Sequence, residues 1–339
     1  MIFNHPQVRR FAKQIVWFVA AGAIAVVTSN RASAQATSFA VLSSSDVSMK
    51  NRVNINPPSG VSGKPSNVGG TTVLMGRGNA AAPDTIGGDV IGTTTAAAGL
   101  DCANNPPGTT AICLGNDSEI AGACTTGGGA ISQPSECTGG ADVSGQSADI
   151  TTLFPQAVSA ASTLSSTLAA LPSTQTLSAI VVGTRGNVTI SSTGGINVVS
   201  VPSIASGTNS TITLNGAATD IFVINVGSST NPGSLQIGNN ASVILAGGIT
   251  PDRVIFNLVG SGTAAQLGNH TVFNGTILAP QGQFTSGDGD TPNPVLINGA
   301  LLFGESISIG NNTNLTFYPF VGVGGGGTSG SGSSSSSAS

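Results

Sequence analysis

The residues of this chain that could hold a metal ion are few, and the best-spaced pair is Asp288 and Asp290 in the stretch SGDGDTPN (286–293). Calcium binds carboxylate oxygens, and an EF-hand loop places its first three ligands at every second position. Position 292, where the third ligand would stand, is a proline. We therefore expect a polar loop, with Asp288 and Asp290 as weak candidates for a Ca²⁺ contact, and we predict that the protein uses no cofactor.

Groups for acid–base or nucleophilic catalysis are also sparse. Glycoside hydrolysis needs two carboxylates that face each other across a cleft, and the glutamates of the chain are Glu119, Glu136 and Glu305. His270 stands where similar stretches carry asparagine, so we expect a turn residue there instead of a catalytic base. We predict that the protein is not an enzyme. A carbohydrate-active β-helix enzyme is the third of three functional hypotheses.

Four cysteines lie within 36 residues of a stretch rich in glycine and proline: Cys102, Cys113, Cys124 and Cys137. The paired C-x₂₋₄-C spacing of a zinc site is absent. In an exported chain we expect two disulfides, with all three pairings open. Because the surrounding segment, about 100–140, has few large apolar side chains, we predict that it is a disulfide-rich insertion in a larger domain.

The first 34 residues have the pattern of an export signal. Arg9, Arg10 and Lys13 precede an apolar run at 15–27, and the small residues at 32–34 suit cleavage. Removal of 1–34 takes four of the ten Lys/Arg residues and no acid, which leaves 6 basic and 14 acidic residues and a net charge of −8. This balance excludes nucleic acid as a partner, and no remaining stretch is apolar enough to span a membrane. We predict a bacterial protein that is secreted or held at the cell surface.

Residues 149–171 carry an apolar stripe at helical spacing. Its members recur at intervals of three and four residues: Ile150, Phe154, Ala157, Ala161, Leu164, Leu168 and Leu171. Pro172 ends the predicted helix. The side chains that we expect to hold it against a large apolar surface are Ile150, Phe154, Leu164 and Leu168. A Leu164→Asp change is expected to destabilise the domain, whereas Ser165→Asp, off the stripe, is expected to be nearly neutral.

The remainder of the chain alternates short apolar runs with Gly, Asn and Ser turns. Residues 220–247 align with 252–279, and the GNN phrase at 238–240 returns at 310–312. Such self-similarity predicts a solenoid, in which each coil buries its apolar side against its neighbours. Asn239, Asn240, Asn311 and Asn312 are then corner residues, because asparagine tolerates the left-handed backbone that corners need. We predict one mainly β domain over 35–322, a right-handed β-solenoid with one long α-helix alongside, and a flexible tail over 323–339.

Several of these stretches resemble the bacterial choice-of-anchor A domain, which is also described as an adhesive or collagen-binding domain. They include DITTLFPQAVSAASTLSSTLAALP (149–172), RVIFNLVGSGTAAQLGNHTVFNGTILAP (253–280) and INGALLFGESISIGNN (297–312). The resemblance covers about 149–320 and, more weakly, 37–92. More distantly, the chain is similar to the ice-binding-like domain, whose members open with a strand comparable to FAVL (39–42). That second resemblance implies a β-helix with one long helix packed beside it.

The leading functional hypothesis is a non-enzymatic adhesive protein, secreted or at the cell surface, that binds an extracellular surface, matrix protein or polysaccharide through a solenoid face. Ice binding is the alternative. Regular ice-binding faces carry rows of T-x-T, and on a predicted strand the chain shows one such unit, Thr211-Ile212-Thr213. The choice-of-anchor A resemblance transfers no catalytic residue.

Overall fold

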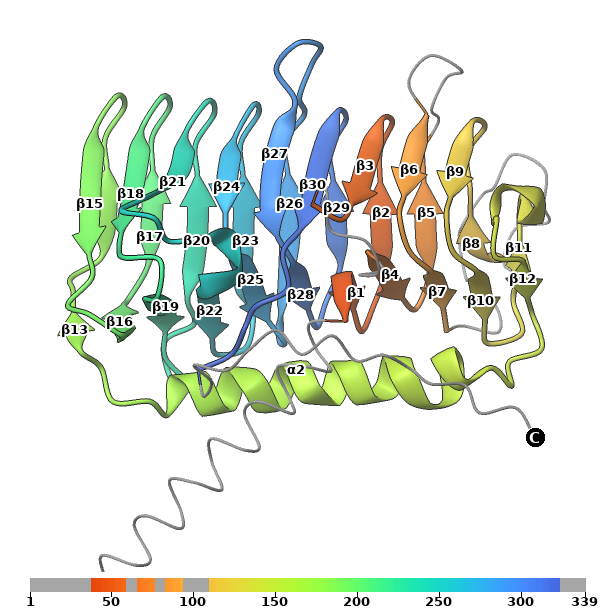
Figure 1. The fold of residues 1–339 in the computed structure, drawn as a ribbon, viewed down its shortest axis with the longest axis horizontal. Helices are drawn as coiled ribbons and strands as arrows, with labels where there is room; N and C mark the ends of the chain where they lie inside the picture. The colour runs from red at the N-terminus through yellow and green to blue at the C-terminus, as the bar shows by residue number, and fades with distance from the viewer. Residues whose placement is uncertain (1–37, 59–65, 77–82, 94–109, 324–339) are drawn as a thin grey trace, which may run out of the picture.

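The computed structural model describes residues 38–58, 66–76, 83–93 and 110–323, which form a β-solenoid of three parallel sheets (Figure 1). The predicted export signal at 1–34, Cys102 and the tail beyond residue 323 lie outside the described residues. A typical coil gives one strand to each of sheets A, B and C, and the next coil stacks on it in register. The predicted fold class, a mainly β solenoid with one long helix alongside, is confirmed.

The strands are named below in their spatial order within each sheet. Sheet A contains β12 (Ala141–Asp142), β10 (Cys124–Thr126), β7 (Val90–Gly92), β4 (Asn67–Gly70), β1 (Phe39–Ser43), β28 (Leu301–Phe303), β25 (Thr276–Ala279), β22 (Val254–Val259), β19 (Ile221–Gly227), β16 (Ile196–Val201) and β13 (Gln175–Thr176). Sheet B contains β11 (Ala130–Ile131), β8 (Thr110–Cys113), β5 (Val73–Met75), β2 (Val47–Met49), β29 (Ile307–Ile309), β26 (Gly282–Ser286), β23 (Thr263–Leu267), β20 (Ser234–Ile237), β17 (Ile204–Ser206) and β14 (Ile180–Val182). Sheet C contains β15 (Asn187–Ser191), β18 (Thr211–Asn215), β21 (Ser242–Ala246), β24 (Val272–Asn274), β27 (Val295–Gly299), β30 (Thr313–Phe317), β3 (Val53–Asn56), β6 (Asp84–Ile86) and β9 (Ser118–Ile120).

The coils do not stack in the order of the chain. Strand β1 lies in the middle of sheet A, between β4 and β28, so the first coil pairs with the last one. From there the early coils proceed to one end of the solenoid at β12. A helix then returns along the stack, and the late coils run from β13 back to the middle. Both free ends of the solenoid are therefore formed by internal parts of the chain.

The returning segment has the length that this path requires. It begins as a π-helix, η2 (Asp149–Leu153), and continues as α2 (Phe154–Ala169). At 1.5 Å per residue, five plus sixteen residues span ~31 Å. The helical segment passes from β10, beside Asp149, to β19, beside Leu168, and seven inter-strand steps amount to about 34 Å. In Figure 1 the helix accordingly runs parallel to the long axis of the solenoid. No helix within the described ranges is long and apolar enough to cross a membrane.

The solenoid interior is a stack of apolar rows. Ile237 on β20 pairs with Leu267 on β23, and both side chains are buried. On its other side, Leu267 pairs with Ser286 on β26. Strand β29, which carries Ile309, pairs with β26 and therefore lies one coil further along. The interval between Leu267 and Ile309 thus contains a complete extra coil, β25 to β27. The sequence does not reveal this coil, because a serine at the inward position, Ser286, breaks the aliphatic pattern.

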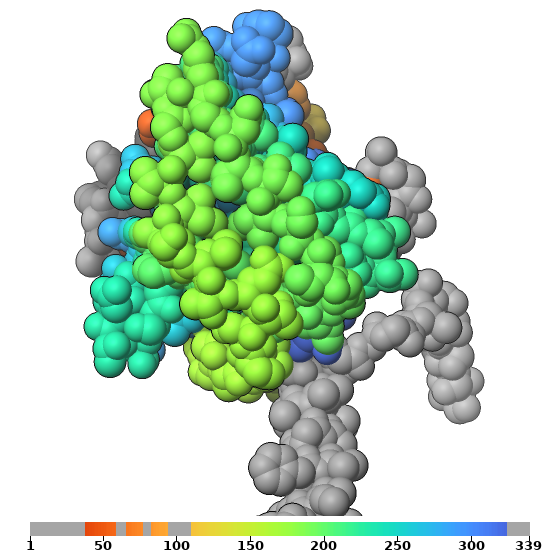
Figure 2. Space-filling model, turned by 90° about the vertical axis from the view of Figure 1, so that its left-hand side faces the viewer, coloured from red at the N-terminus to blue at the C-terminus, as the bar shows by residue number. Residues whose placement is uncertain are grey.

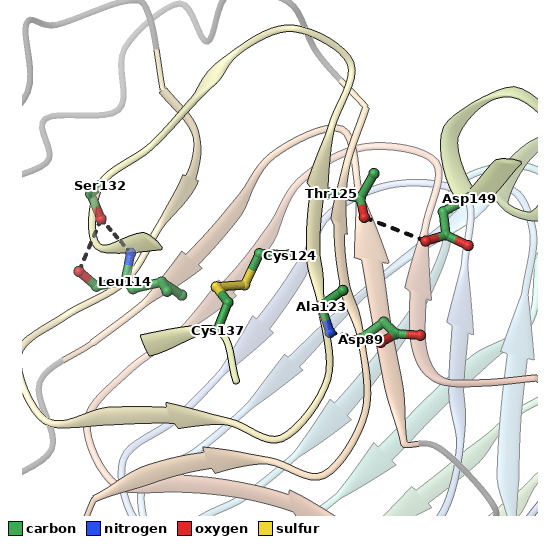
Figure 3. The surroundings of a disulfide bond; sticks show 8 residues. All are labelled: Asp89, Leu114, Ala123, Cys124, Thr125, Ser132, Cys137 and Asp149. Carbon is green, nitrogen blue, oxygen red and sulfur yellow. Dashed lines mark hydrogen bonds between the residues drawn. A yellow bond between two sulfur atoms is a disulfide. The ribbon is translucent and has the colours of Figure 1, made fainter. Parts of the chain in front are cut away.

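From residue 110 onward, the cysteine segment is part of the solenoid and not an insertion. Its strands β8, β9 and β10 extend sheets B, C and A in turn, and β11 and β12 add to sheets B and A. Cys124 and Cys137 form a disulfide (Figure 3), and both are buried in the same apolar core as Ile112, Ile120 and Ile131. Cystine here occupies interior space that aliphatic side chains fill in other coils. This substitution explains why the segment looked too poor in apolar residues to continue the core.

Candidate binding faces

The central strands of sheet A are covered because α2 lies on them. Phe154, Leu164 and Leu168 are buried, and Ile150 is partly buried against the same core, so the four predicted stripe residues lie at this contact. Gly69 on β4 makes room for the helix: a Cβ there would lie 2.8 Å from Phe39 Cε1 and 2.9 Å from Phe154 Cδ2. The helix therefore buries apolar side chains on the outer side of sheet A.

The second half of this contact is polar, which the sequence interpretation missed. Ser165 is buried, and its hydroxyl donates to Asn257 Oδ1 at 2.6 Å. Asn257 Nδ2 donates to the Ser165 carbonyl at 3.0 Å and to Asn225 Oδ1 at 2.8 Å, and Asn225 Nδ2 donates to the Leu168 carbonyl at 2.9 Å. The expectation that Ser165 faces solvent was wrong. A signal was present, since Asn225 and Asn257 interrupt two apolar strands at the same position of the aligned repeats.

The corner between sheets B and C repeats one backbone conformation. A residue with φ between 48° and 59° stands at this corner in seven coils: Arg52, Asp117, Arg185, Asn209, Asn240, His270 and Asn312. The prediction that Asn240 and Asn312 are left-handed corner residues is confirmed, and His270 has the same role. Asn239 and Asn311, one residue earlier, act through their side chains instead.

Those side chains form a ladder that links successive coils. Asn239 Oδ1 accepts the backbone N–H of Asn269, Asn269 Oδ1 that of Asp288, and Asp288 Oδ1 that of Asn311, each at 2.9 Å. Asp288 also pairs with Lys50 Nζ at 3.1 Å. The backbone N–H of Asn311, followed by the Lys50 ammonium, holds the pKa of Asp288 below its usual value. Asp288 is therefore a corner residue with its own partners.

The other calcium candidate, Asp290, has one potential metal ligand nearby, His270. Asp290 Oδ1 accepts the N–H of Asn293 at 3.2 Å, and its Oδ2 is 3.9 Å from His270 Nε2. Within the described ranges, no three His, Cys, Asp or Glu side chains gather closely enough to hold a metal ion. The loop 287–294 that carries both aspartates projects past the B–C corner, as the blue segment at the top of Figure 2 shows.

Asp84 is a buried carboxyl that the sequence interpretation did not single out. Its Oδ1 accepts the N–H of Val53 at 2.6 Å, while Oδ2 has no hydrogen-bond partner in the described structure. Loss of solvation raises the pKa of Asp84 to about 6, against the lowering effect of the Val53 and Arg52 backbone N–H groups. In the register of sheet C, Asp84 lies beside Ser118, whose hydroxyl donates to the Gly115 carbonyl. Asp84 thus occupies a corner position that a hydroxyl residue fills in the next coil.

The disulfide sits among further contacts between the early coils. Figure 3 shows the Ala123 backbone N–H directed at Asp89 Oδ1, 2.9 Å away, and Ser132 bonded to Leu114 across neighbouring strands. Cys113 is also disulfide-bonded. No free cysteine occurs in the described part of the chain. These groups fasten coils together and provide no reactive thiol.

Sheet B presents one long outward row of uncharged side chains. In register from one end to the other these are Val181, Ala205, Gln236, Gln266, Thr285, Ser308, Ser48 and Leu74. Val181 is 77% exposed at the end of the row. The strands of sheet B are short, so few coils offer a second outward position.

Sheet C presents a broader array. Its first outward row is Asn187, Thr211, Ser242, Val272, Leu296, Asn314, Asn54, Thr85 and Glu119. A second row, two residues further along each strand, begins with Thr189, Thr213 and Ile244 and continues with Asn274, Asn298, Thr316 and Asn56. Among these positions only Glu119, on the last described strand, carries a charge. The arrangement can bind a flat, uncharged, repeating surface, because it offers short polar and apolar groups on a regular grid.

Part of sheet C is pre-ordered by side-chain hydrogen bonds. Asn298 Nδ2 donates to Asn274 Oδ1 at 2.9 Å, and Asn274 Nδ2 donates to the Val243 carbonyl at 2.8 Å. A second chain runs from Thr85 Oγ1 to Asn54 Oδ1 at 2.9 Å and from Asn54 Nδ2 to Asn314 Oδ1 at 3.0 Å. These side chains are held in one orientation before any ligand arrives.

Comparison with known proteins identifies the family. The family model described as Ice-binding-like matches residues 107–314. Similar solved structures include the ice-binding protein of the Antarctic ascomycete Antarctomyces psychrotrophicus, with 18% identity, a TM-score of 0.48 and coverage of 84% of this chain and 96% of that one. An ice-binding protein from an Antarctic biological consortium shows 17% identity, a TM-score of 0.45 and coverage of 83% and 89%.

The remaining comparisons add no second family. An ice-binding protein from an Arctic yeast shows 12% identity, a TM-score of 0.42 and coverage of 83% of this chain and 92% of that one. No curated protein matches the sequence. The choice-of-anchor A resemblance, which led the sequence interpretation, has no support in these matches, whereas the more distant resemblance does. Because the matched residues make up more than half of its length, the chain belongs to the Ice-binding-like family.

Proposed function

We propose that this protein is a non-enzymatic, secreted ice-binding protein that contacts ice through a face of its solenoid. Membership of the Ice-binding-like family supports the proposal, as do the similar proteins that are named for ice binding. The observation that carries it is the grid of outward side chains on sheets B and C, which repeats from strand to strand with almost no charge. A charged group keeps its hydration unless a partner replaces it, and ice offers no such partner.

The repeat matters as much as the lack of charge. Neighbouring parallel strands lie about 4.8 Å apart, so equivalent side chains meet a crystalline surface at a constant interval. Each contact of a hydroxyl, amide or methyl group with water is weak, and affinity requires that many act together on a rigid support. The stacked coils and the helix on sheet A supply that support. The adhesive function that the sequence favoured has no observation of its own in the structure.

The test uses the chain from residue 35 onward, purified with its disulfides formed. We expect thermal hysteresis, inhibition of ice recrystallisation and enrichment of the protein in a slowly grown ice crystal. EDTA should change none of these, because Asp288 is engaged by Lys50 and Asn311. Heat-denatured protein is the control. Exclusion from ice, combined with retention on collagen or on a polysaccharide matrix, would overturn the proposal in favour of adhesion.

A further inference from the structure

A hollow at the corner between sheets B and C departs from the regular plan of the solenoid. It has a volume of about 220 Å³ and is lined by the 287–294 loop and by residues at strands β3 and β30. The loop is long for a corner: β26 connects to β27 over 287–294, whereas the corners on either side take only 268–271 and 310–312. In Figure 1 the loop rises above both of these neighbours. The extra residues thus build a concave wall that the adjoining coils lack.

The hollow has one cation and one anion on its walls, Arg52 and Asp290. The ion pairs among the described residues are Lys50–Asp288 and His270–Asp290. Arg52 and Asp290 therefore do not pair with each other across the hollow, and Arg52 has no carboxylate partner in the part of the chain that the structure describes. The two opposite charges are both placed where a ligand can meet them.

Both groups keep hydrogen-bonding capacity. The Arg52 guanidinium donates to Asn312 Oδ1 at 3.5 Å, a long bond that uses one of its five N–H groups. Asp290 Oδ1 accepts the N–H of Asn293 at 3.2 Å, whereas Oδ2 is 3.9 Å from His270 Nε2, beyond hydrogen-bond length. The Asp290 side chain is 61% exposed. Arg52 can therefore donate to a ligand, and Asp290 Oδ2 can accept from it.

The remaining walls are amide groups and proline rings. Asn54 Nδ2 donates to Asn314 Oδ1 at 3.0 Å, and Thr85 Oγ1 donates to Asn54 Oδ1 at 2.9 Å. These bonds hold both amides and leave the NH₂ group of Asn314 as a further donor. Pro292 and Pro294 line the same hollow and contribute C–H surface. The hollow thus combines positioned donors, an acceptor and an apolar wall.

We propose that this hollow binds a neutral sugar unit, a ring with hydroxyl groups at its edge and C–H groups on its faces. A hydroxyl both donates and accepts, so one ring can accept from Arg52 and Asn314, donate to Asp290 and rest a C–H face on the prolines. Because the two wall charges balance, a ligand without net charge suits the hollow best. The volume of about 220 Å³ corresponds to roughly seven water molecules, which leaves room for one ring.

The proposal goes beyond ice binding and does not depend on it. A free sugar and one unit of a polysaccharide offer the same chemistry, and the experiment distinguishes these two sources. The chain used to test ice binding is titrated by saturation-transfer NMR with methyl glycosides of glucose, galactose and mannose, and with the corresponding tetrasaccharides. We expect at least one glycoside to bind with a Kd of about a millimolar, as befits a small ligand in an open site. Tighter binding of the matching tetrasaccharide indicates a polysaccharide as the source, and equal binding indicates a free sugar.

Arg52→Asn is the main variant, and Arg185→Asn is its matched control. Both arginines stand at a B–C corner with a φ of 59°, and asparagine has the same left-handed conformation at Asn209, Asn240 and Asn312. Both variants lose one positive charge, but of the two arginines only Arg52 lines the hollow. We expect Arg52→Asn to raise the Kd about tenfold, because a charged donor is lost, and Arg185→Asn to leave it unchanged. Circular dichroism with thermal melting checks that both variants fold.

Asp290→Asn tests the acceptor. The variant keeps an Oδ1 that can accept the N–H of Asn293, so the loop should hold its shape, but the carboxylate charge is gone. We expect the Kd to rise about fivefold, because a hydroxyl binds a carboxylate more strongly than an amide oxygen.

Three results would overturn the proposal. The first is that none of the glycosides or tetrasaccharides binds. The second is an equal loss in Arg52→Asn and Arg185→Asn, which would be an effect of net charge and not of the hollow. The third concerns alanine, a zwitterion that could also pair with Arg52 and Asp290: binding of alanine without binding of any sugar would assign the hollow to amino acids.

Discussion

The coils before the helix and the coils after it follow one plan, but they are fastened differently. In the late coils, corner Asn and Asp side chains link successive coils: Asn239, Asn269 and Asp288 each accept a backbone N–H from the next coil. In the early coils, the Cys124–Cys137 disulfide stands in the core, and a buried carboxyl, Asp84, occupies a corner position. The early coils also have side-chain acceptors of this kind, Asn67 and Asp89, but they add a covalent bond and a buried carboxyl.

The helix meets the two groups of coils in correspondingly different ways. Over the early coils its contact is apolar: the Phe154 ring lies 6.3 Å from the Phe39 ring, at an interplanar angle of 86°. Over the late coils, Ser165 and the Leu168 carbonyl bond to Asn257 and Asn225. Apolar contact is non-directional, so it attaches the helix without fixing its position. The amide pairs are directional, and we expect them to fix where along sheet A the helix rests.

The largest effect should come from breaking the attachment that both groups of coils share. Leu164, on the side of α2 that faces the solenoid, is completely buried. Leu164→Asp therefore places an unpaired charge in the core and should cost about 3–5 kcal/mol of unfolding free energy. Thr163→Asp, on the exposed side of the helix, is the control and should change stability little. Urea denaturation measures both. Similar losses for the two variants would mean that the helix does not pack as described.

Much of this architecture could be predicted from the sequence, and the exceptions share a cause. The 3- and 4-residue spacing of Phe154, Leu164 and Leu168 predicts the buried side of the helix, because apolar burial leaves a periodic trace. Ser165 leaves no such trace, since a serine is equally common on an exposed face, and its role depends on Asn257, 92 residues away. The insertion of β1 between β4 and β28 is likewise invisible in sequence order.

The same reasoning applies to the candidate site. Thr211 and Thr213 could be recognised as a T-x-T unit, but their alignment with Asn187 and Thr189 depends on the register of β15 and β18. The sequence supplied ice binding only as an alternative, because the nearer resemblance was to the choice-of-anchor A domain and one T-x-T unit stood on a predicted strand.

The next effect tests the covalent fastening of the early coils. A Cys124→Ala, Cys137→Ala double variant opens a loop with a sequence separation of 13, and the lost constraint should cost about 3 kcal/mol. Amide hydrogen exchange should rise first in β9, β10 and β11 and remain low in β18 and β22. The variant is preferable to a reductant, because Cys113 is disulfide-bonded as well. A uniform rise across all coils would contradict separate fastening of the two groups.

A third effect depends on pH and also belongs to the early coils. Because the pKa of Asp84 is raised to about 6 in the folded chain, the folded state binds this proton more tightly than the unfolded state does. This contribution to stability is therefore full below about pH 4 and falls as pH rises to about 6, by roughly 2–3 kcal/mol. Asp84→Asn should remove it. Urea denaturation of both proteins at pH 4 and pH 7 measures the change, and a constant difference between them would contradict this role of Asp84.

The smallest effect tests the polar half of the helix contact. Ser165→Ala removes the hydroxyl donor to Asn257 Oδ1 and leaves a buried acceptor short of a partner, which should cost about 1–2 kcal/mol. Ser166→Ala, on the exposed neighbour, should be nearly neutral. In a double-mutant cycle with Asn257→Ala, the two losses should not add, because both changes remove the same bond. The Ser165 carbonyl bond to Asn257 Nδ2 survives in Ser165→Ala, so the cycle isolates the hydroxyl. Additive losses would show that the Ser165 hydroxyl is merely buried and that its bond to Asn257 does not stabilise the helix contact.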